Sequence, residues 1–252
     1  MRILLGRHAE SDGNVDAQNY VKIGDARTGI TEQGCRQAIA MGEFLADYYK
    51  NTQTVQWPSI FVSSYLRPQQ TFRGVYEGIR DNFIGEPKLK EDVRLIEKFF
   101  GAASHLAFAD DKVDPDVKRA LEVLSKRTYL NDAFSASHLF GESTLNTFVR
   151  AKQFIEGTLA RDIEEGQDDF LIMTHGAVIQ AFIMAWAHLP MASKGKLGNP
   201  NNCDVIVIEG EPKNWTIRKV YDGEAMKPVD IDLVASIDHL SVQTLPPLPH
   251  QI

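Results

Sequence analysis

The sequence predicts an α/β fold: a three-layer sandwich with a mostly parallel central sheet flanked by helices, and with a helical insertion over the site. Three short, mostly apolar segments at residues 3–5, 59–62 and 170–173 have the length and composition of buried strands. Segments with apolar residues at helical spacing follow the second and third of these. Because strands that alternate with helices are typical of a parallel sheet, this order favours the α/β class.

The first half of the chain continues this alternation. Residues 14–31 are polar and contain glycine, so we expect a loop that overhangs the end of the first strand. Thr31 is a suitable N-cap for a helix that reaches about Tyr49. A second helix follows the strand at 59–62. Residues 88–97 alternate partly between apolar and polar side chains, which predicts one more strand.

The second half of the chain supplies two helices and a hairpin. Ser143 is placed to cap a helix that ends near the break at residues 164–166. Residues 178–186 are apolar on nearly all sides and should form a buried helix. The apolar segments 204–208 and 215–220 are separated by a turn that contains Gly, Pro and Asn, which predicts a hairpin at the edge of the sheet.

We expect one α/β domain over residues 1–226, with an insertion at about 98–140, followed by a C-terminal tail at 227–252. A chain of 252 residues, 43% hydrophobic and 24% charged, can bury one sizeable core. Asp114 and Pro115 suit the start of a helix inside the insertion. The tail contains proline and could bind a partner as a polyproline segment, but a loosely packed terminus is the favoured interpretation.

Charge and composition exclude several classes of function. The net charge of −7 and the pI near 5.5 argue against a broad surface for nucleic acid or acidic membranes. Two cysteines make neither a disulfide framework nor a metal site. The N-terminal apolar run is too short for a signal sequence, and no segment reaches membrane-spanning length. We therefore expect a cytoplasmic protein that needs no metal or cofactor; its oligomeric state is left open.

Cationic and imidazole side chains follow three of the predicted strands. Arg7 and His8 come after the first strand, Arg67 shortly after the second and His175 directly after the third. An isolated Arg-His pair is most often part of a surface loop. In open α/β sheets, however, ligands bind at the carboxyl ends of the strands. Two arginines and two histidines at three such ends indicate a single site for an anion.

These motifs resemble the histidine phosphatase superfamily, which includes the cofactor-dependent phosphoglycerate mutases and many small-molecule phosphatases. The resemblance covers residues 2 to about 208. It rests on the Arg-His start, the Ser-x-x-x-Arg-x-x-x-Thr block at 63–71 and the Thr-His-Gly block at 174–176. Ala9 stands where the commoner pattern has glycine, and other branches of the family resemble this chain in having alanine there.

The resemblance implies catalysis through a phosphohistidine. His8 would attack phosphorus as a neutral imidazole, with its other ring nitrogen held by a nearby backbone carbonyl. Arg7 and Arg67 would bind the phosphate oxygens through their planar guanidinium groups. His175 would donate to an oxygen and stabilise charge in the transition state. Asn14 matches the family's asparagine that also contacts phosphate.

Glu97 is the expected acid for the leaving group, because residues 94–101 resemble the family's block of leucine, glutamate and an aromatic-glycine pair. Its pKa would have to be raised by burial or by phosphate charge. A solvated surface glutamate is the alternative interpretation. Glu142 is a second candidate that we interpret as structural. Ser63 and Thr71 resemble family positions that support the arginine turn through hydrogen bonds.

The expected activity is metal-independent hydrolysis of small phosphomonoesters. Phosphoglycerate mutase-type transfer is the first alternative, but the paired arginines that mutases carry in the insertion are missing between residues 112 and 127. A scaffold that binds phosphorylated ligands without turnover is the second. The insertion suits sugar phosphates, nucleotides and phosphoproteins about equally, so the sequence does not identify the substrate.

Overall fold

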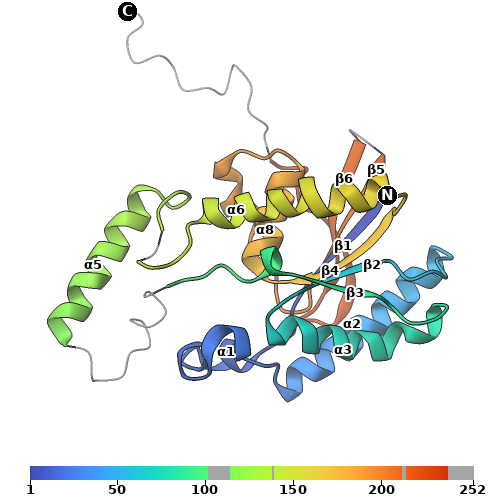
Figure 1. The fold of residues 1–252 in the computed structure, drawn as a ribbon, viewed down its shortest axis with the longest axis horizontal. Coiled ribbons are helices and arrows are strands. Elements are labelled where there is room, and N and C mark those ends of the chain that lie inside the picture. Colours follow the sequence, from blue (N-terminus) through green and yellow to red (C-terminus); the bar gives the residue numbers. More distant parts are fainter. Residues whose placement is uncertain (102–113, 138, 212–213, 238–252) are drawn as a thin grey trace, which may run out of the picture.

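A seven-stranded mixed sheet lies between two layers of helices (Figure 1), which confirms the three-layer α/β fold. The structure is a computed structural model, and it describes residues 1–101, 114–137, 139–211 and 214–237. The strand order across the sheet is β3-β2-β4-β1-β5-β6-β7. The first four of these strands pair in parallel, and the last three are antiparallel additions beside β1.

The strands are β1 (Arg2–Arg7), β2 (Ser59–Ser63), β3 (Leu89–Asp92), β4 (Asp169–Thr174), β5 (Val205–Glu211), β6 (Asn214–Asp222) and β7 (Lys227–Asp232). The α-helices are α1 (Asp12–Val15), α2 (Glu32–Asn51), α3 (Leu66–Ile79), α5 (Pro115–Asn131), α6 (Thr144–Gln153), α7 (Ala160–Glu164), α8 (Gly176–Trp186) and α9 (Lys194–Leu197). Shorter turns of helix are η1 (Tyr20–Gly24), η2 (Asp25–Arg27), η3 (Arg80–Asn82), η4 (Val93–Leu95), η5 (Phe154–Leu159) and η6 (Met191–Ser193).

The core is divided in two by the sheet. Because successive side chains of a strand point to opposite faces, Leu4 packs with α2 and α3 on one face. Ile3 and Leu5 pack with α6, η5 and α8 on the other. All three side chains are fully buried. The central strands are therefore fixed from both sides, and the loops at their carboxyl ends start from a rigid frame.

Two helix starts lie where the sequence places them. The Thr31 hydroxyl accepts a hydrogen bond from the Gly34 amide at 2.9 Å, which makes it the N-cap of α2. The Ser143 hydroxyl accepts one from the Asn146 amide at 3.0 Å and caps α6 in the same way. Both hydrogen bonds satisfy backbone donors that a helix leaves unpaired in its first turn.

The structure differs from the sequence interpretation at the C-terminal end of the domain. Residues 227–232 were expected in the tail, but they form β7, which pairs with β6. The β5–β6 hairpin is consequently not at the edge of the sheet. β7 is mostly exposed and contains Pro228, as edge strands can, so its sequence lacks the apolar alternation of a buried strand. The proline-rich end of the expected tail lies outside the described residues.

The predicted overhanging loop is partly helical. Residues 14–31 include the end of α1 and the short segments η1 and η2. The predicted insertion contains α5, which stands apart from the three layers (Figure 1), while residues 102–113 of that insertion lie outside the described part of the chain. None of the helices that the structure describes has the length and apolarity needed to cross a membrane.

Candidate active site

The carboxyl ends of β1, β2 and β4 lie side by side, at the same end of the sheet. Parallel pairing sets Arg7 opposite Thr174, and β2 pairs with the other side of β4. His8 and His175 directly follow β1 and β4, and Arg67 is the second residue of α3 after β2. The structure therefore brings together the two arginines and the two histidines that the sequence singles out.

His8 is buried, and its two ring nitrogens have different partners. Nδ1 lies 2.8 Å from the carbonyl oxygen of Ala9, which can only accept, so this nitrogen carries the hydrogen. Nε2 accepts a hydrogen bond from Nε of Arg67 at 3.2 Å. Burial, and after it the charges of Arg67 and Arg7, hold the pKa of His8 well below its usual value. His8 is thus a neutral imidazole with the lone pair on Nε2, which is the form that a nucleophile requires.

Arg67 is a buried cation, with 1% of its surface exposed. The rings of Tyr20 and Tyr65 each lie 5.3 Å from its guanidinium carbon. Its Nη1 atom is 2.7 Å from the backbone oxygen of Asp25 and 2.8 Å from the carboxylate of the same residue. Asp25 lies in the predicted loop, in a segment that resembles the family, but the sequence does not assign it a role in the site. Its carboxylate provides the counter-charge that a buried guanidinium needs.

Arg7 and His175 each add one buried nitrogen donor to the site. Nε of Arg7 and Nδ1 of His175 are buried and have no hydrogen-bond partner in the described part of the chain. The His175 ring lies edge-on to the His8 ring, with 5.1 Å between centroids. Its Nε2 is 2.9 Å from the Ser63 hydroxyl, and when that hydroxyl donates to Nε2 the single ring hydrogen of the neutral imidazole is on Nδ1, which is then a donor. Burial, and after it the nearby cationic charges, lower the pKa of His175 far below normal. Unpaired buried donors beside a nucleophile are suited to the oxygens of an anion.

Glu97 follows η4 and points toward the histidines. Its side chain is 14% exposed, and one carboxylate oxygen lies 3.9 Å from Nδ1 of His175. The other oxygen accepts the Lys98 amide at 2.8 Å. Burial raises the pKa of Glu97 above its ordinary value. A carboxyl with a raised pKa next to the nucleophile can hold the proton that a leaving group needs.

His8, Glu97 and His175 offer potential ligand atoms within 4.8 Å of one another, so they could hold a metal ion. The electrostatics of the site argue against a cation there. Arg7 and Arg67 flank the same space with permanent positive charges, and both appear among the charges that lower the pKa of the two histidines. The site is therefore better suited to an oxyanion than to a divalent metal.

Asn14 lies at the rim of the site. Its side-chain oxygen accepts hydrogen bonds from the Ser11 hydroxyl at 2.9 Å and from the Asn202 amide at 3.2 Å. Asn202 also donates to the backbone oxygen of His8 at 3.0 Å, so it connects Asn14 to the histidine turn. Sequence reasoning missed Asn202. No motif in the sequence points to Asn202, because it reaches the site only through the antiparallel pairing of β5 with β1, which places the turn before β5 at the carboxyl end of β1.

Ser63 and Thr71 support different parts of the site. The Thr71 hydroxyl accepts the Ala9 amide at 2.9 Å and donates to the Arg67 carbonyl at 2.7 Å, which ties the histidine turn to α3. Ser63 contacts His175 rather than either arginine. The Ser63 hydroxyl also accepts the Tyr65 amide at 3.3 Å, within the turn that leads to Arg67, so the predicted hydrogen-bonding role fits both residues.

Glu142 is engaged in an ion pair. Its two oxygens accept from Nε and Nη2 of Arg150 at 2.9 and 3.0 Å, and one of them also accepts the Phe99 amide at 3.0 Å. These contacts hold the start of α6 against the segment that follows Glu97. They agree with the structural role expected for Glu142.

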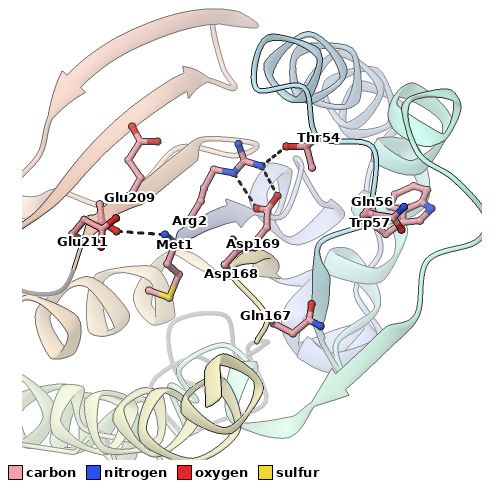
Figure 2. Close-up of a pocket in the computed structure, with 11 residues that line it drawn as sticks. Met1, Arg2, Thr54, Gln56, Trp57, Gln167, Asp168, Asp169, Glu209 and Glu211 are labelled. Carbon is pink, nitrogen blue, oxygen red and sulfur yellow. Dashed lines mark hydrogen bonds and ion pairs between the residues drawn. The ribbon is translucent and has the colours of Figure 1, made fainter. Parts of the chain in front are cut away.

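A pocket of about 590 Å³ lies at the opposite end of the strands, away from the histidines (Figure 2). It is lined by the amino ends of β1 and β4 and by the end of β5, and it contains none of the histidines. Figure 2 shows Arg2 held between Asp169 and Thr54. The charges of this pocket are thus largely paired within the protein, and it offers no nucleophile.

Comparison with protein families gives one match over most of the chain. The model described as the histidine phosphatase superfamily (branch 1) matches residues 3–223. Phosphoglycerate mutase-like protein AT74 of Arabidopsis thaliana is 29% identical over 82% of this chain and 64% of its own length. This chain therefore spans less than two thirds of that relative. Glucosyl-3-phosphoglycerate phosphatase of Mycobacterium tuberculosis is 27% identical over 83% of this chain and 85% of its own.

Solved structures show the same fold. A putative α-ribazole-5′-P phosphatase from Escherichia coli superimposes with a TM-score of 0.63 and is 20% identical over 87% of this chain and 95% of its own. The complex of a mycobacterial glucosyl-3-phosphoglycerate phosphatase with inorganic phosphate has a TM-score of 0.60 and is 22% identical over 90% of this chain and 99% of its own. At these identities the likeness concerns the fold alone.

Proposed function

The chain belongs to branch 1 of the histidine phosphatase superfamily, and we propose that it hydrolyses small phosphomonoesters, without a metal, through a phosphohistidine on His8. The observation that carries the proposal is the tautomer of His8. The Ala9 carbonyl holds the hydrogen on Nδ1, and Arg67 lies at the unprotonated Nε2. A nucleophile whose lone pair faces the phosphate-binding cation is arranged for attack on phosphorus.

In the first step, Nε2 of His8 attacks phosphorus and the bond from phosphorus to the ester oxygen breaks. Glu97 acts here in its protonated form, which burial favours by raising its pKa, and gives its proton to the departing oxygen. Arg7, Arg67 and the unpaired Nδ1 of His175 bind the phosphoryl oxygens while charge develops on them. The phosphohistidine is cationic on its ring, and the Ala9 carbonyl stabilises the Nδ1 hydrogen.

In the second step, water attacks phosphorus on the phosphohistidine. Glu97, now a carboxylate, takes one proton from this water. The phosphorus–nitrogen bond breaks, and its electron pair returns to Nε2 of His8. Inorganic phosphate leaves, and the protein is again in its starting protonation state, with Glu97 protonated and His8 neutral.

Hydrolysis is preferred over transfer for two reasons. The insertion lacks the paired arginines that the resemblance to mutases would require. One of the relatives, the glucosyl-3-phosphoglycerate phosphatase of Mycobacterium tuberculosis, bears the name of a phosphatase. Mutase-type transfer stays the alternative because two relatives are named phosphoglycerate mutase-like.

The test is turnover of p-nitrophenyl phosphate in the presence and absence of EDTA. We expect equal rates in both, and rapid acid-labile labelling of the protein by a ³²P-labelled ester. His8→Ala should abolish both signals. Loss of activity with EDTA would contradict the metal-independent mechanism, and absence of both turnover and labelling between about pH 5 and 8 would favour a binding scaffold.

A separate experiment distinguishes phosphatase from mutase. The protein is incubated with 3-phosphoglycerate and a trace of the bisphosphate, and both free phosphate and the isomeric product are measured. We expect free phosphate to accumulate first. Formation of the isomer faster than free phosphate would instead establish transfer.

A further inference from the structure

A pocket of about 470 Å³ lies beside α8 and α9, and its lining includes Gln180, Lys194 and Asn199. Gln180 is on α8, the helix that begins directly after His175. The Asn199 side chain covers the first residue of the same helix, because a Cβ atom placed on Gly176 would lie 3.1 Å from its Cγ. Asn199 therefore connects the lining of the pocket to the first residue of α8, which directly follows His175.

Two lysines share one acceptor at the side of this pocket. Nζ of Lys98 and Nζ of Lys194 donate to the Thr144 hydroxyl at 3.3 and 3.0 Å. Lys98 directly follows Glu97 in the chain and is 3% exposed. Lys194 is half-buried and lines the pocket itself. The pair thus connects the proposed leaving-group acid to the pocket.

The positive charge of this pair is not balanced at Lys194. No carboxylate among the described residues forms an ion pair with Lys194, and Glu142, the nearby acid, is held by Arg150. Burial, and after it the charge of Lys194, lower the pKa of Lys98 to about 8. The Lys98 ammonium also lies 5.6 Å from the centroid of the Phe100 ring, and the charges of Glu142 and Glu97 act on it as well, whereas Lys194 donates to the Thr144 hydroxyl, a weak acceptor for an ammonium group. Two like charges at such short range repel each other. An anion bound between them would remove that repulsion.

The first turn of α6 adds positive electrostatic potential at the lysine pair. Thr144 is its first residue, so the amino end of this helix lies at the lysine pair. A helix carries partial positive charge at its amino end, which favours an anion there. The pocket also has apolar walls from Phe134 and Met191, which suit the carbon skeleton of a leaving group.

We propose that Lys98, Lys194 and Thr144 form a subsite for a second anionic group, a carboxylate or a phosphoryl group, carried by the leaving-group part of the substrate. The inference rests on the proposed phosphatase function, because it names the class of ester that the site prefers. Phosphomonoesters with a second anion would place one phosphoryl group on His8 and the other anion between the lysines.

The test compares three series of esters with spacers of increasing length. The ω-carboxyalkyl phosphates and the ω-phosphonoalkyl phosphates carry a second anion, and a phosphonate cannot be cleaved at its carbon–phosphorus bond. The ω-hydroxyalkyl phosphates are the matched neutral compounds. For at least one spacer length we expect kcat/KM for an anionic ester to exceed that of its neutral match by about tenfold, the size of one charge-assisted hydrogen bond. The better of the two anionic series identifies the anion.

The variant Lys194→Met should remove this preference, so that the ratio of anionic to neutral kcat/KM falls about tenfold. Lys194→Arg, which keeps the charge, should retain most of it. Lys196→Met removes a lysine from the same short helix outside the pocket and should keep the ratio of the unmodified protein. The thermal unfolding midpoint of each variant verifies that it is folded, and Lys194→Gln replaces Lys194→Met if the methionine variant is not.

Binding by calorimetry in the His8→Asn variant, which lacks the nucleophile, gives a readout that does not depend on turnover. The same preference for the anionic esters is expected there, and Lys194→Met should again remove it. A ratio near one at every spacer length, or a preference that survives in Lys194→Met, would overturn the subsite. Absence of turnover together with a preference in binding would refute the phosphatase activity and leave the subsite standing.

Discussion

Nε of Arg67 lies 3.2 Å from Nε2 of His8, and both side chains are buried. Arg67, the cation expected to bind the phosphate, therefore also donates a hydrogen bond to Nε2 of His8, the nitrogen expected to attack phosphorus. An anion entering the site has to take over the guanidinium hydrogens from the imidazole, which leaves the lone pair of His8 available for phosphorus. In the proposed mechanism, this contact joins substrate binding to the release of the nucleophile.

Glu97→Gln should separate esters by the basicity of their leaving groups. An alkoxide needs a proton as it departs, whereas p-nitrophenolate does not, so the loss in kcat/KM, which does not contain the hydrolysis of the phosphohistidine, should be about 10²- to 10⁴-fold for an alkyl phosphate and much smaller for p-nitrophenyl phosphate. Because burial raises the pKa of Glu97, kcat/KM of the unmodified protein for alkyl esters should fall as the pH rises through that value. Steady-state kinetics against pH measure both effects.

Glu142→Gln is the matched control for this prediction. Glu142 is bound to Arg150 and has no assigned part in proton transfer. Any loss of kcat/KM in this variant should therefore be the same for the alkyl ester and for p-nitrophenyl phosphate. An equal loss for both esters in Glu97→Gln would remove Glu97 from the role of acid.

Asp25→Asn should strengthen the binding of oxyanions. The Asp25 carboxylate lies 2.8 Å from Nη1 of Arg67, where it repels an incoming phosphate. Its replacement by the neutral amide should lower the inhibition constant of orthovanadate about fivefold, which corresponds to roughly 1 kcal/mol. Asp47→Asn, on the exposed face of α2, should leave this constant unchanged. Weaker inhibition in Asp25→Asn would show that the carboxylate orders the site instead of competing for it.

The buried neutral histidines should make the protein sensitive to acid. Below a pH of about 6.5 an unfolded histidine binds a proton, whereas folded His8 and His175 have strongly lowered pKa values and do not. The unfolded chain then binds more protons, so the free energy of unfolding falls as the pH falls. Between pH 6.5 and 5 the unmodified protein loses unfolding free energy, and His8→Asn should reduce this loss by about 1.5 kcal/mol.

Urea unfolding at a series of pH values measures this effect. The comparison with the unmodified protein cancels the contributions of groups that both proteins retain, including Glu97. His188→Asn provides the control, since this histidine is exposed. The slope of its unfolding free energy against pH should equal that of the unmodified protein. Identical slopes for His8→Asn and the unmodified protein would show that His8 is not held neutral.

Gly78→Ala should destabilise the helical layer formed by α2 and α3. A Cβ atom on Gly78 would lie 2.6 Å from the carbonyl carbon of Gly42 and 2.7 Å from the amide nitrogen of Glu43, so the two helix backbones would have to separate. Overpacking of this kind costs about 1–3 kcal/mol of unfolding free energy. A Cβ atom on Gly157 would lie 3.5 Å from Nη1 of Arg94, which is an ordinary contact, so Gly157→Ala should be neutral or slightly stabilising. Urea unfolding compares them, and a Gly78→Ala variant as stable as the parent protein would contradict the close packing.

Local patterns in the sequence determined the elements that carry the site. The apolar runs before Arg7, Ser63 and His175 have the period and length of buried strands, and the caps at Thr31 and Ser143 follow from hydrogen bonding within a few residues. Such short-range signals do not depend on the rest of the fold, so they identify the motifs and the fold class.

Tertiary structure alone decided which side chains meet. The register of β1, β2 and β4 brings His8, Arg67 and His175 together, and the antiparallel entry of β5 brings Asn202 beside them. The position of Asp25 on Arg67, the sharing of Thr144 by two lysines and the addition of β7 also join residues far apart in the chain or without a motif. Strand pairing and packing fix these contacts through the burial of whole faces, and no single stretch of sequence contains that information.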